Sequence, residues 1–292
     1  MRTKSIWFIV NPISGGKSKK HIIQQIEIFF AERKENIQIH LTEYAGHGKK
    51  ITEQAVQENI NIVCAVGGDG SVHEISTVLI HSNTTLAIIP SGSGNGFARH
   101  FGIQKHVKRN LQRLISNNTV LVDAVKLNKH YFISNAGIGF DAYVAQQFSS
   151  SKTRGLISYT RIVIRSLSRF TTYSATLQIA ENKLTFDHLL FLSIANTSEL
   201  GNGFKLAPNA DATDGEVEII VISKPSLCQF IKILFQSYRG TLRTNPNVHY
   251  WKAKKGTIIC SQRMCQVDGE YINDQLDKIE FETIEKAIKL IV

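Results

Sequence analysis

Three short loops combine glycine with small polar residues, and each directly follows an apolar run. They span residues Asn11–Gly16, Gly67–Ser71 and Ser91–Gly96. Glycine lets a backbone come close to a phosphate group. A helix that begins after such a loop also directs free N–H groups and the positive end of its dipole towards the anion. The spacing therefore indicates an edge that binds phosphate groups.

Asp69, in the middle of the second loop, carries the wrong charge to bind phosphate directly. We expect this carboxylate to face solvent and either to hold Mg²⁺ or to position an attacking hydroxyl group. The alternative is an ordinary Gly-Asp-Gly turn in which Ser71 caps a helix that starts near it.

The first loop runs on into Lys17 and Ser18, and the sequence Gly16-Lys-Ser is similar to the end of a P-loop. A P-loop needs a glycine where Asn11 stands, and Pro12 removes one backbone amide. The pattern favours a different strand-to-helix turn beside a phosphate. A plain turn with solvated lysines is the alternative.

Two acidic clusters follow in the second half of the chain. Asp211, Asp214 and Glu216 place three carboxylates within six residues. Such a density is unfavourable unless a cation or solvent screens it. Asp268 and Glu270 flank Gly269 in a second cluster. The alternatives are a solvated acidic turn for the first cluster and a tight β-turn for the second.

The elements that must position these residues change in type along the chain. Up to about residue 123, apolar strand-like runs alternate with helical periodicity, which predicts a parallel sheet with crossover helices. The predicted strands are 5–10, 37–41, 61–66 and 86–89, and the predicted helices are 17–34, 49–58 and 72–80. Ligands of such sheets bind beyond the carboxyl ends of the strands, where all three loops fall.

The remainder predicts a mainly antiparallel β domain. Its strand-like runs are 173–180, 188–195, 217–222, 255–260 and 278–281, with helix candidates at 154–170 and 227–238. A closing strand at 287–292 is expected to return to the first domain. We therefore predict an α/β fold in which residues 1–123 form a parallel-sheet nucleotide domain and residues 124–286 form the β domain.

Composition narrows the class of protein. The chain has 292 residues, which suits two domains, and an apolar content of 42% excludes wholesale disorder. Its apolar runs are too short to span a bilayer, and only five apolar residues follow its basic start, too few for a signal peptide. Four scattered cysteines form neither a disulfide framework nor a zinc motif. These features predict a cytoplasmic protein with reduced thiols.

Charge points to an anionic partner, because the formal net charge is +10. Residues 142–180 contain no Asp or Glu, while Arg161, Arg165 and Arg169 recur at every fourth position. A helix would place these arginines on one side. We expect this segment to dock on an anionic membrane. The alternative is a solvated helix that packs on its own protein.

The motifs NPISGG, GGDGSVHE, PSGSGNGFARH, ATDGEVEI and QVDGE together resemble the diacylglycerol kinase catalytic family, over nearly the whole chain and in family order. The last two distinguish this resemblance from NAD kinases and phosphofructokinases, which also carry GGDG-type loops. The resemblance implies an N-terminal α/β nucleotide domain, a C-terminal β-sandwich, and ATP and Mg²⁺ bound between them.

The resemblance also assigns roles to individual residues. Asp268 and Glu270 match the catalytic acidic pair, one of them being the base. Asp69 is a further candidate catalytic residue, on the argument from its own loop given above. Asp211, Asp214 and Glu216 fall where bacterial members hold a structural Mg²⁺, partly through backbone carbonyls. The implied nucleotide contacts are Asn11, Ser14, Gly15, Gly16, Thr42, Gly67, Gly68, Asp69, Gly70, Ser71, Val72, His73 and Ser93. Gly96 departs from the Asp that many members have there.

We therefore predict an ATP- and Mg²⁺-dependent lipid kinase that phosphorylates the hydroxyl group of diacylglycerol or a related lipid. The expected partner is a lipid at an anionic membrane surface, to which the protein binds peripherally, and no nucleic acid. Whether the chain forms a homodimer is left open. The alternatives are a kinase of a soluble substrate, similar to NAD kinase, and a catalytically silent protein that binds nucleotide or lipid.

Overall fold

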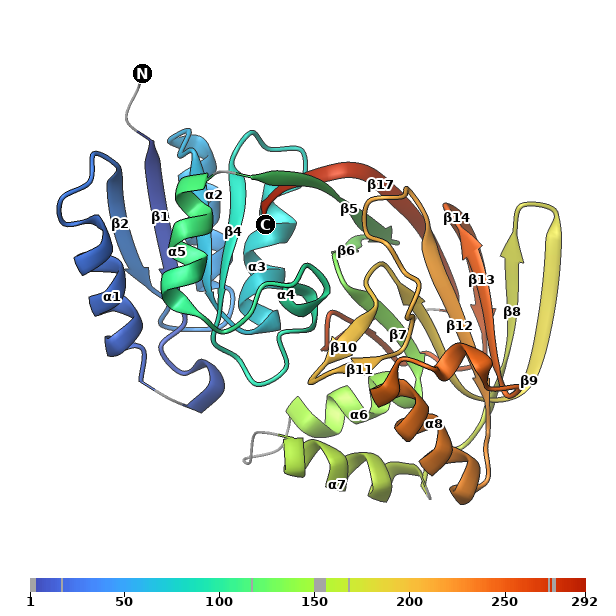
Figure 1. The fold of residues 1–292 in the computed structure, drawn as a ribbon. Coiled ribbons are helices and arrows are strands. Elements are labelled where there is room, and N and C mark those ends of the chain that lie inside the picture. The colour runs from blue at the N-terminus through green and yellow to red at the C-terminus, as the bar shows by residue number, and fades with distance from the viewer. Residues whose placement is uncertain are drawn as a thin grey trace. The chain divides into compact units, whose positions relative to one another are not determined.

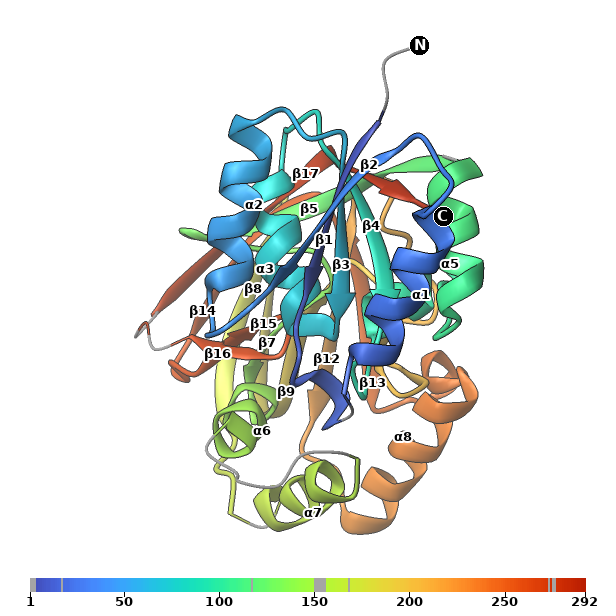
Figure 2. The same cartoon turned by 90° about the vertical axis from the view of Figure 1, so that its left-hand side faces the viewer.

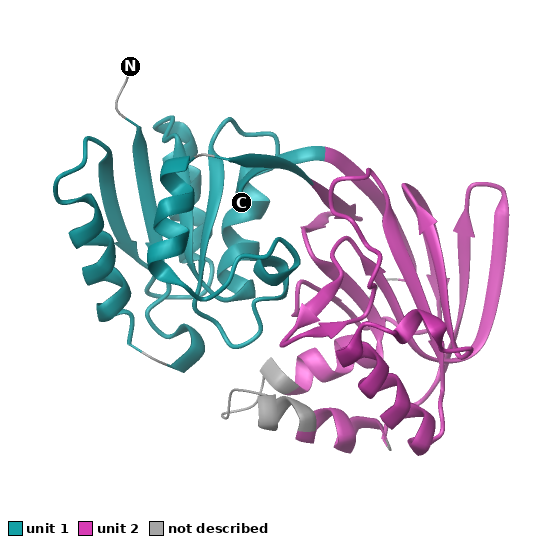
Figure 3. Cartoon of the chain, in the orientation of Figure 1, with its two compact units in different colours: residues 1–122, 286–292 teal, residues 123–285 magenta. Residues whose placement is uncertain are grey.

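The computed structural model describes residues 4–16, 18–116, 118–149, 156–167, 169–272, 274 and 277–292. The chain divides into two compact units (Figure 3). Unit 1 consists of Met1–Val122 and Lys286–Val292, and unit 2 consists of Asp123–Glu285. Strands β5 (Thr119–Leu127) and β17 (Lys278–Ile291) each run from one unit into the other.

The sheet of unit 1 is parallel, as predicted. Its strands are β1 (Ser5–Val10), β2 (Asn36–Leu41), β3 (Ile62–Gly67) and β4 (Thr85–Pro90), in the spatial order β4-β3-β1-β2. The end of β17 pairs in parallel with β4, where Leu290 lies opposite Leu86. Strands β3 and β4 are buried along their whole length. Continuous apolar strands of this kind are typical of parallel sheets covered on both faces.

Helices cover both faces of this sheet (Figures 1 and 2). Helices α2 and α3 lie on one face, and α1 and α5 lie on the other, where Ile26, Phe30, Leu111 and Leu114 pack against β1 and β3. The helices of unit 1 are α1 (Lys20–Phe30), α2 (His47–Gln57), α3 (Asp69–Leu79), α4 (Gly96–His100) and α5 (Val107–Ser116).

Several predicted helix boundaries were wrong. Helix α3 begins at Asp69 rather than near Ser71, because Gly68 is extended and the chain turns helical directly after it. A carboxylate in this first turn is favourable beside the positive end of the helix dipole. Helix α1 ends at Phe30 rather than at residue 34. There, Arg33 donates hydrogen bonds from its backbone N–H to the Phe30 carbonyl (3.0 Å) and from its Nε to the Phe29 carbonyl (3.1 Å).

Unit 2 is the expected antiparallel, β-sandwich-like domain. A path of antiparallel strands runs β16-β15-β7-β9-β8-β14-β17, and β12 and β13 extend from β9. The strands are β6 (His130–Phe132), β7 (Asn135–Gly139), β8 (Tyr173–Ile179), β9 (Asn182–Ala195), β12 (Val217–Ser223), β13 (Val248–Ala253), β14 (Lys255–Cys260), β15 (Cys265–Val267) and β16 (Glu270–Ile272), with a small hairpin of β10 (Glu199–Gly201) and β11 (Phe204–Lys205).

The α-helices in the described part of unit 2 are α6 (Phe140–Ser149), α7 (Leu156–Leu167) and α8 (Leu227–Arg239). Helix α8 was predicted, whereas α6 was not. The expected helical row of three arginines was wrong, because α7 ends at Leu167 and Arg169 follows it. Arg161 and Arg165 are both exposed on α7. The basic residues 152 and 154 lie outside the described residues. No described helix has the length and apolar character needed to cross a membrane, and all four cysteines are free thiols.

Asp141 lies in the first turn of α6 and is largely enclosed by unit 2. Its Oδ2 accepts a hydrogen bond of 2.6 Å from Gln266 Nε2. A Cβ atom on Gly137 would lie 2.1 Å from the same oxygen, so the glycine leaves the space that this carboxylate occupies. Burial raises the pKa of the Asp141 carboxyl to about 6, and the Gln266 hydrogen bond opposes that rise.

The raised pKa predicts a pH-dependent stability. Ionisation of Asp141 is penalised in the folded state, so its contribution to the free energy of unfolding falls as the pH rises from about 4 through 6. Asp141→Asn removes this loss. From pH 4 to pH 7, the unfolding free energy of the variant should gain about 2–3 kcal/mol relative to wild type. Urea unfolding at both pH values measures the change.

The matched control is Asp187→Asn, which changes an exposed carboxylate of the same unit. Its stability difference from wild type should stay nearly constant over the same pH range. Equal pH dependence in Asp141→Asn and wild type would contradict the assignment of a raised pKa to Asp141.

Candidate functional site

The three glycine loops of unit 1 lie side by side. Strands β1, β3 and β4 are parallel neighbours, so the loops that follow them emerge at one edge of the sheet. Asn11 Nδ2 donates a hydrogen bond of 3.2 Å to Ser71 Oγ, which joins the first loop to the second. The hydroxyl groups of Ser14 and Ser91 are hydrogen-bonded at 3.0 Å, which joins the first loop to the third. The structure therefore brings together residues from all three motifs.

Glycines allow these loops to approach each other. A Cβ atom on Gly92 would lie 2.4 Å from the Gly68 Cα atom, and one on Gly68 would lie 3.1 Å from the Gly92 Cα atom. Gly15 has a φ of +63°, and a Cβ atom on it would lie 2.2 Å from the Ser91 carbonyl oxygen. The close approach that requires glycine at these positions is thus loop against loop, whereas the sequence predicts only an approach to phosphate.

Asn95 links the second and third loops through hydrogen bonds. It is buried in the left-handed conformation, and its side chain both accepts from the Gly92 N–H and donates to the Gly92 carbonyl, each at 2.9 Å. Its backbone N–H donates a hydrogen bond of 2.7 Å to Asp69 Oδ2. Asp69 is half-buried in the first turn of α3, so the expectation of a solvent-facing loop carboxylate was wrong. Its role towards Mg²⁺ or a hydroxyl group stays a prediction.

The other predicted nucleotide contacts differ in how exposed their side chains are. Ser93 is exposed, and Thr42 is half-buried just after β2, where its N–H donates to the Val10 carbonyl at 2.9 Å. Val72 is buried in α3, so only its backbone is suited to a ligand. His73 is half-buried, and its carbonyl accepts a hydrogen bond from Thr77 Oγ1 at 2.9 Å. Gly70 is half-buried in the first turn of the same helix.

Lys19 is a residue that sequence reasoning missed. Its side chain is buried, and its Nζ donates a hydrogen bond to the Ser14 carbonyl in the first loop. Burial lowers the pKa of this ammonium group, and Lys105 lowers it further. In the sequence, Lys19 belongs to a basic run that is typical of a solvated face. The structure instead places its positive charge under the loop that is predicted to lie beside phosphate.

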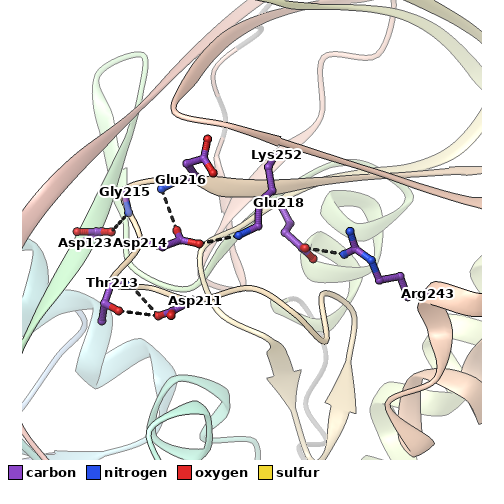
Figure 4. A network of polar contacts seen from close by, with 9 residues as sticks. All are labelled: Asp123, Asp211, Thr213, Asp214, Gly215, Glu216, Glu218, Arg243 and Lys252. Carbon is purple, nitrogen blue, oxygen red and sulfur yellow. Dashed lines mark hydrogen bonds and ion pairs between the residues drawn. The ribbon is translucent and has the colours of Figure 1, made fainter.

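In the predicted metal turn of unit 2, the carboxylates of Asp211 and Asp214 have protein partners, and the Glu216 side chain is exposed (Figure 4). Asp214 Oδ2 lies 2.6 Å from Lys252 Nζ, and Asp214 Oδ1 accepts from the Glu216 N–H at 3.0 Å. Asp211 Oδ1 accepts from the backbone and the hydroxyl group of Thr213. Within the described part of the chain, no group of three or more His, Cys, Asp or Glu side chains is suited to hold a metal ion.

Asp123 orders this turn, although no sequence motif singled it out. It is buried, its Oδ2 accepts from the Gly215 N–H at 2.8 Å, and its own N–H donates to the Ala212 carbonyl at 2.7 Å. The hydrogen bond to Asp214 is the main reason why the pKa of Lys252 is raised. An ammonium group therefore balances part of the negative charge. These side chains do not form a metal cage, and the predicted Mg²⁺ site stays a prediction that depends on backbone carbonyls.

The second acidic pair separates into one buried and one exposed carboxylate. Asp268 is 8% exposed and accepts three backbone hydrogen bonds, from Ile133, Ser134 and Asn135 at 3.0, 2.8 and 3.0 Å. Glu270, two residues later at the start of β16, is exposed. The sequence left open which of the two is the base. This geometry favours Glu270 and gives Asp268 a positioning role.

Gln266 joins this turn to Asp141. Its Nε2 donates to Asn135 Oδ1 at 2.9 Å and to Asp141, and its Oε1 accepts from the Gly269 N–H at 2.7 Å. The buried Gln266 side chain thus holds the turn from one side while Asp268 holds it from the other. We infer that the main-chain position of Glu270 is fixed by these buried polar contacts.

The contact between the two glycines predicts a local effect. Gly92→Ala should push the second and third loops apart, and exchange of the Asn95 amide hydrogen should accelerate about tenfold or more. Gly102→Ala is the control, because Gly102 has left-handed backbone geometry but no other group within 4 Å of the place that a methyl group would take. Hydrogen exchange measures both variants. Unchanged exchange at Asn95 in Gly92→Ala would refute a packing role for the glycine pair.

The two members of the acidic pair should differ in their effect on stability. Asp268→Asn replaces one accepting oxygen by an amide donor that faces backbone N–H groups. It should lower the free energy of unfolding by about 1–3 kcal/mol. Glu270→Gln alters an exposed side chain and should stay within about 0.5 kcal/mol of wild type. Urea unfolding compares the two variants, and an equal small effect of both would remove the positioning role of Asp268.

Comparisons with known proteins agree with this architecture. Residues 5–127 match the family model described as the diacylglycerol kinase catalytic domain, and residues 134–292 match the YegS C-terminal NAD kinase beta sandwich-like domain. A diacylglycerol kinase of Bacillus subtilis is 27% identical over 270 residues, which cover 90% of this chain and 88% of that protein. A diacylglycerol kinase of Staphylococcus haemolyticus is 28% identical over 269 residues, or 90% and 81%.

Solved structures share the fold. A diacylglycerol kinase from Bacillus anthracis aligns over 100% of this chain and 97% of its own, with a TM-score of 0.75 and 18% identity. An NAD kinase from Archaeoglobus fulgidus in complex with ATP aligns over 98% and 93%, with a TM-score of 0.57 and 11% identity. The two family models together account for both units, and the chain therefore belongs to the diacylglycerol kinase family and is a kinase, a transferase that uses an alcohol group as acceptor.

Proposed function

We propose that the protein is an ATP- and Mg²⁺-dependent lipid kinase that phosphorylates the hydroxyl group of diacylglycerol or a related lipid. The observation that carries the proposal is the three-loop edge of unit 1, where β1, β3 and β4 present closely packed glycine loops. Backbone N–H groups in such loops bind phosphate oxygens. The names of the relatives and the ATP complex of the NAD kinase with the same fold support this assignment.

The chain's own residues then have the following roles. Phosphoryl transfer depends mainly on positioning and on neutralising negative charge. The three loops hold the phosphate groups, and Lys19 adds a positive charge beneath the first loop. Glu270 orients or deprotonates the acceptor hydroxyl group, because it is the exposed member of the acidic pair. Mg²⁺ enters with ATP as part of the substrate and supplies charge neutralisation. No step depends on a metal ion in the 211–216 turn.

A lipid acceptor would be met at a membrane surface, so we propose peripheral binding to an anionic membrane. Arg161 and Arg165 are exposed on α7, and residues 142–180 contain no Asp or Glu. Each basic residue near an anionic surface contributes about 1 kcal/mol to binding. Salt should weaken this attraction, because the Debye length is about 8–10 Å at physiological ionic strength.

The base assignment predicts a specific kinetic effect. Glu270→Gln should lower kcat by roughly 10²- to 10⁴-fold and leave ATP affinity nearly unchanged, because it removes a proton acceptor while keeping the shape. Glu181→Gln is the control, since Glu181 is an exposed carboxylate in the β8–β9 turn of the same unit. The assay follows transfer from radiolabelled ATP to mixed micelles that contain diacylglycerol.

The same assay tests the substrate class. A panel of monoacylglycerol, a sphingoid base, undecaprenol and NAD in place of diacylglycerol ranks the acceptors. Transfer to NAD with none to any lipid would overturn the lipid assignment. A Glu270→Gln variant that turns over at the wild-type rate would overturn the role of Glu270.

A further inference from the structure

Helix α8 has an apolar outer face. Leu227, Ile231, Phe235 and Tyr238 are 63%, 58%, 58% and 64% exposed. Their spacing of four, four and three residues places them on one side of the helix. The inner face buries Phe230 and Ile233 in the core of unit 2. Among the described residues, the helix is therefore apolar on two sides, of which the inner side is buried and the outer side is largely exposed.

The helix that carries this outer face is capped at both ends. At the start, Ser226 and Gln229 form a reciprocal capping box, with hydrogen bonds of 3.4 and 2.8 Å. At the end, Gly240 takes the left-handed conformation and donates to the Ser237 carbonyl at 3.2 Å. Such caps stabilise a helix and resist fraying. The four apolar side chains are thus presented on an ordered surface.

Basic residues lie along one edge of the apolar face, because Lys232 and Arg239 follow Ile231 and Tyr238 by one position in the helix. Lys224, Lys232 and Arg239 are exposed on or beside α8, and the Arg239 guanidinium carbon lies 5.4 Å from the centroid of the Phe235 ring. No Asp or Glu occurs from residue 219 to residue 267. An apolar stripe with a cationic border is typical of helices that lie in the interface of an anionic bilayer.

Helix α7 is a neighbour of α8 that also carries exposed apolar and basic residues. It lies next to α8 in both views (Figures 1 and 2). It carries the exposed Ile164 (58%) and the exposed Arg161 and Arg165. We define the docking face as Leu227, Ile231, Phe235 and Tyr238 of α8, together with Lys232 and Arg239, which follow two of them in the helix.

We propose that this docking face binds an anionic bilayer, with α8 lying in the interface plane. The apolar side chains enter the boundary of the acyl chains, and the lysines and arginines stay among the headgroups. The biological purpose, access to a lipid acceptor, rests on the proposed function, whereas the docking itself rests on the surface. A second copy of the chain fits less well, because a two-fold contact through this face would bring like charges together.

The experiment measures binding of the full chain to phosphatidylglycerol and phosphatidylcholine vesicles by cosedimentation. Ile231→Ser/Phe235→Ser should weaken binding to phosphatidylglycerol vesicles at least tenfold. Lys232→Gln/Arg239→Gln should weaken it at low salt and less at high salt. The matched control is Ile28→Ser/Ile259→Ser, which removes two exposed apolar side chains elsewhere and should bind as wild type does. Circular dichroism verifies the fold of each variant.

Three outcomes would overturn the proposal. The first is unchanged vesicle binding by Ile231→Ser/Phe235→Ser, and the second is equal binding of the wild type to neutral and anionic vesicles. The third is a wild-type dimer that forms with rising concentration in sedimentation and that Ile231→Ser/Phe235→Ser abolishes. The last outcome would assign the face to an interface between copies.

A second arm separates docking from catalysis. With a short-chain, water-soluble diacylglycerol, Ile231→Ser/Phe235→Ser should turn over at the wild-type rate, and with diacylglycerol in phosphatidylglycerol vesicles it should be at least tenfold slower. Equal slowing in both assays would overturn docking as the role of the face. A wild-type protein that binds the vesicles but phosphorylates no lipid would overturn the proposed function and leave the docking face intact.

Discussion

The candidate site of unit 1 depends on one close contact, in which the backbone at Gly68 and the backbone at Gly92 lie against each other with no room for a side chain on Gly92. This contact is what allows the loops after β3 and β4 to form one edge. The hydrogen bond from the Asn95 N–H to Asp69 then fixes the distance between the two loops. Any ligand that uses amides from both loops depends on this pairing.

In unit 2, a buried carboxylate rather than a pair of glycines holds together segments that are distant in the sequence. Asp268 gathers three backbone N–H groups from the Ile133–Asn135 segment, and these amides lie more than a hundred positions away in the sequence. A buried carboxylate that accepts several backbone hydrogen bonds is costly to disturb, because each amide left without a partner keeps its desolvation penalty. The position of the exposed Glu270 thus depends on Asp268, whose carboxylate is used to bind backbone N–H groups.

The sequence predicted the parts of the fold that continuous apolar runs define. Strands β1, β3 and β4 are buried throughout or nearly so, and their loops could be located directly from the end of each run. Strand β7, Asn-Ala-Gly-Ile-Gly, could not be recognised, because all of its residues except Ile138 have little intrinsic preference for a strand. It forms by pairing with β9 and β15. Helix α6, which follows it directly, was missed with it.

The roles of individual site residues were harder to predict from the sequence, because their hydrogen-bond partners are far away along the chain. Asp123 and Gly215 are 92 positions apart, and nothing near Asp123 indicates that it orders an acidic turn. Lys19 stands in a run of basic residues that resembles an exposed face. For such residues, only tertiary contacts distinguish a buried charge from a solvated one.

The aspartates of the candidate sites differ from Glu270 in what their carboxylates bind. The short side chains of Asp69, Asp123 and Asp268 each accept hydrogen bonds from backbone N–H groups of a neighbouring segment. A carboxylate used in this way is positioned by the fold and in turn positions a loop, so its substitution alters geometry before it alters chemistry. Glu270, one methylene longer and exposed, belongs to a turn that such an aspartate already holds. Proton transfer to a carboxylate requires that the group be reachable by the acceptor hydroxyl, and within this acidic pair that condition favours Glu270.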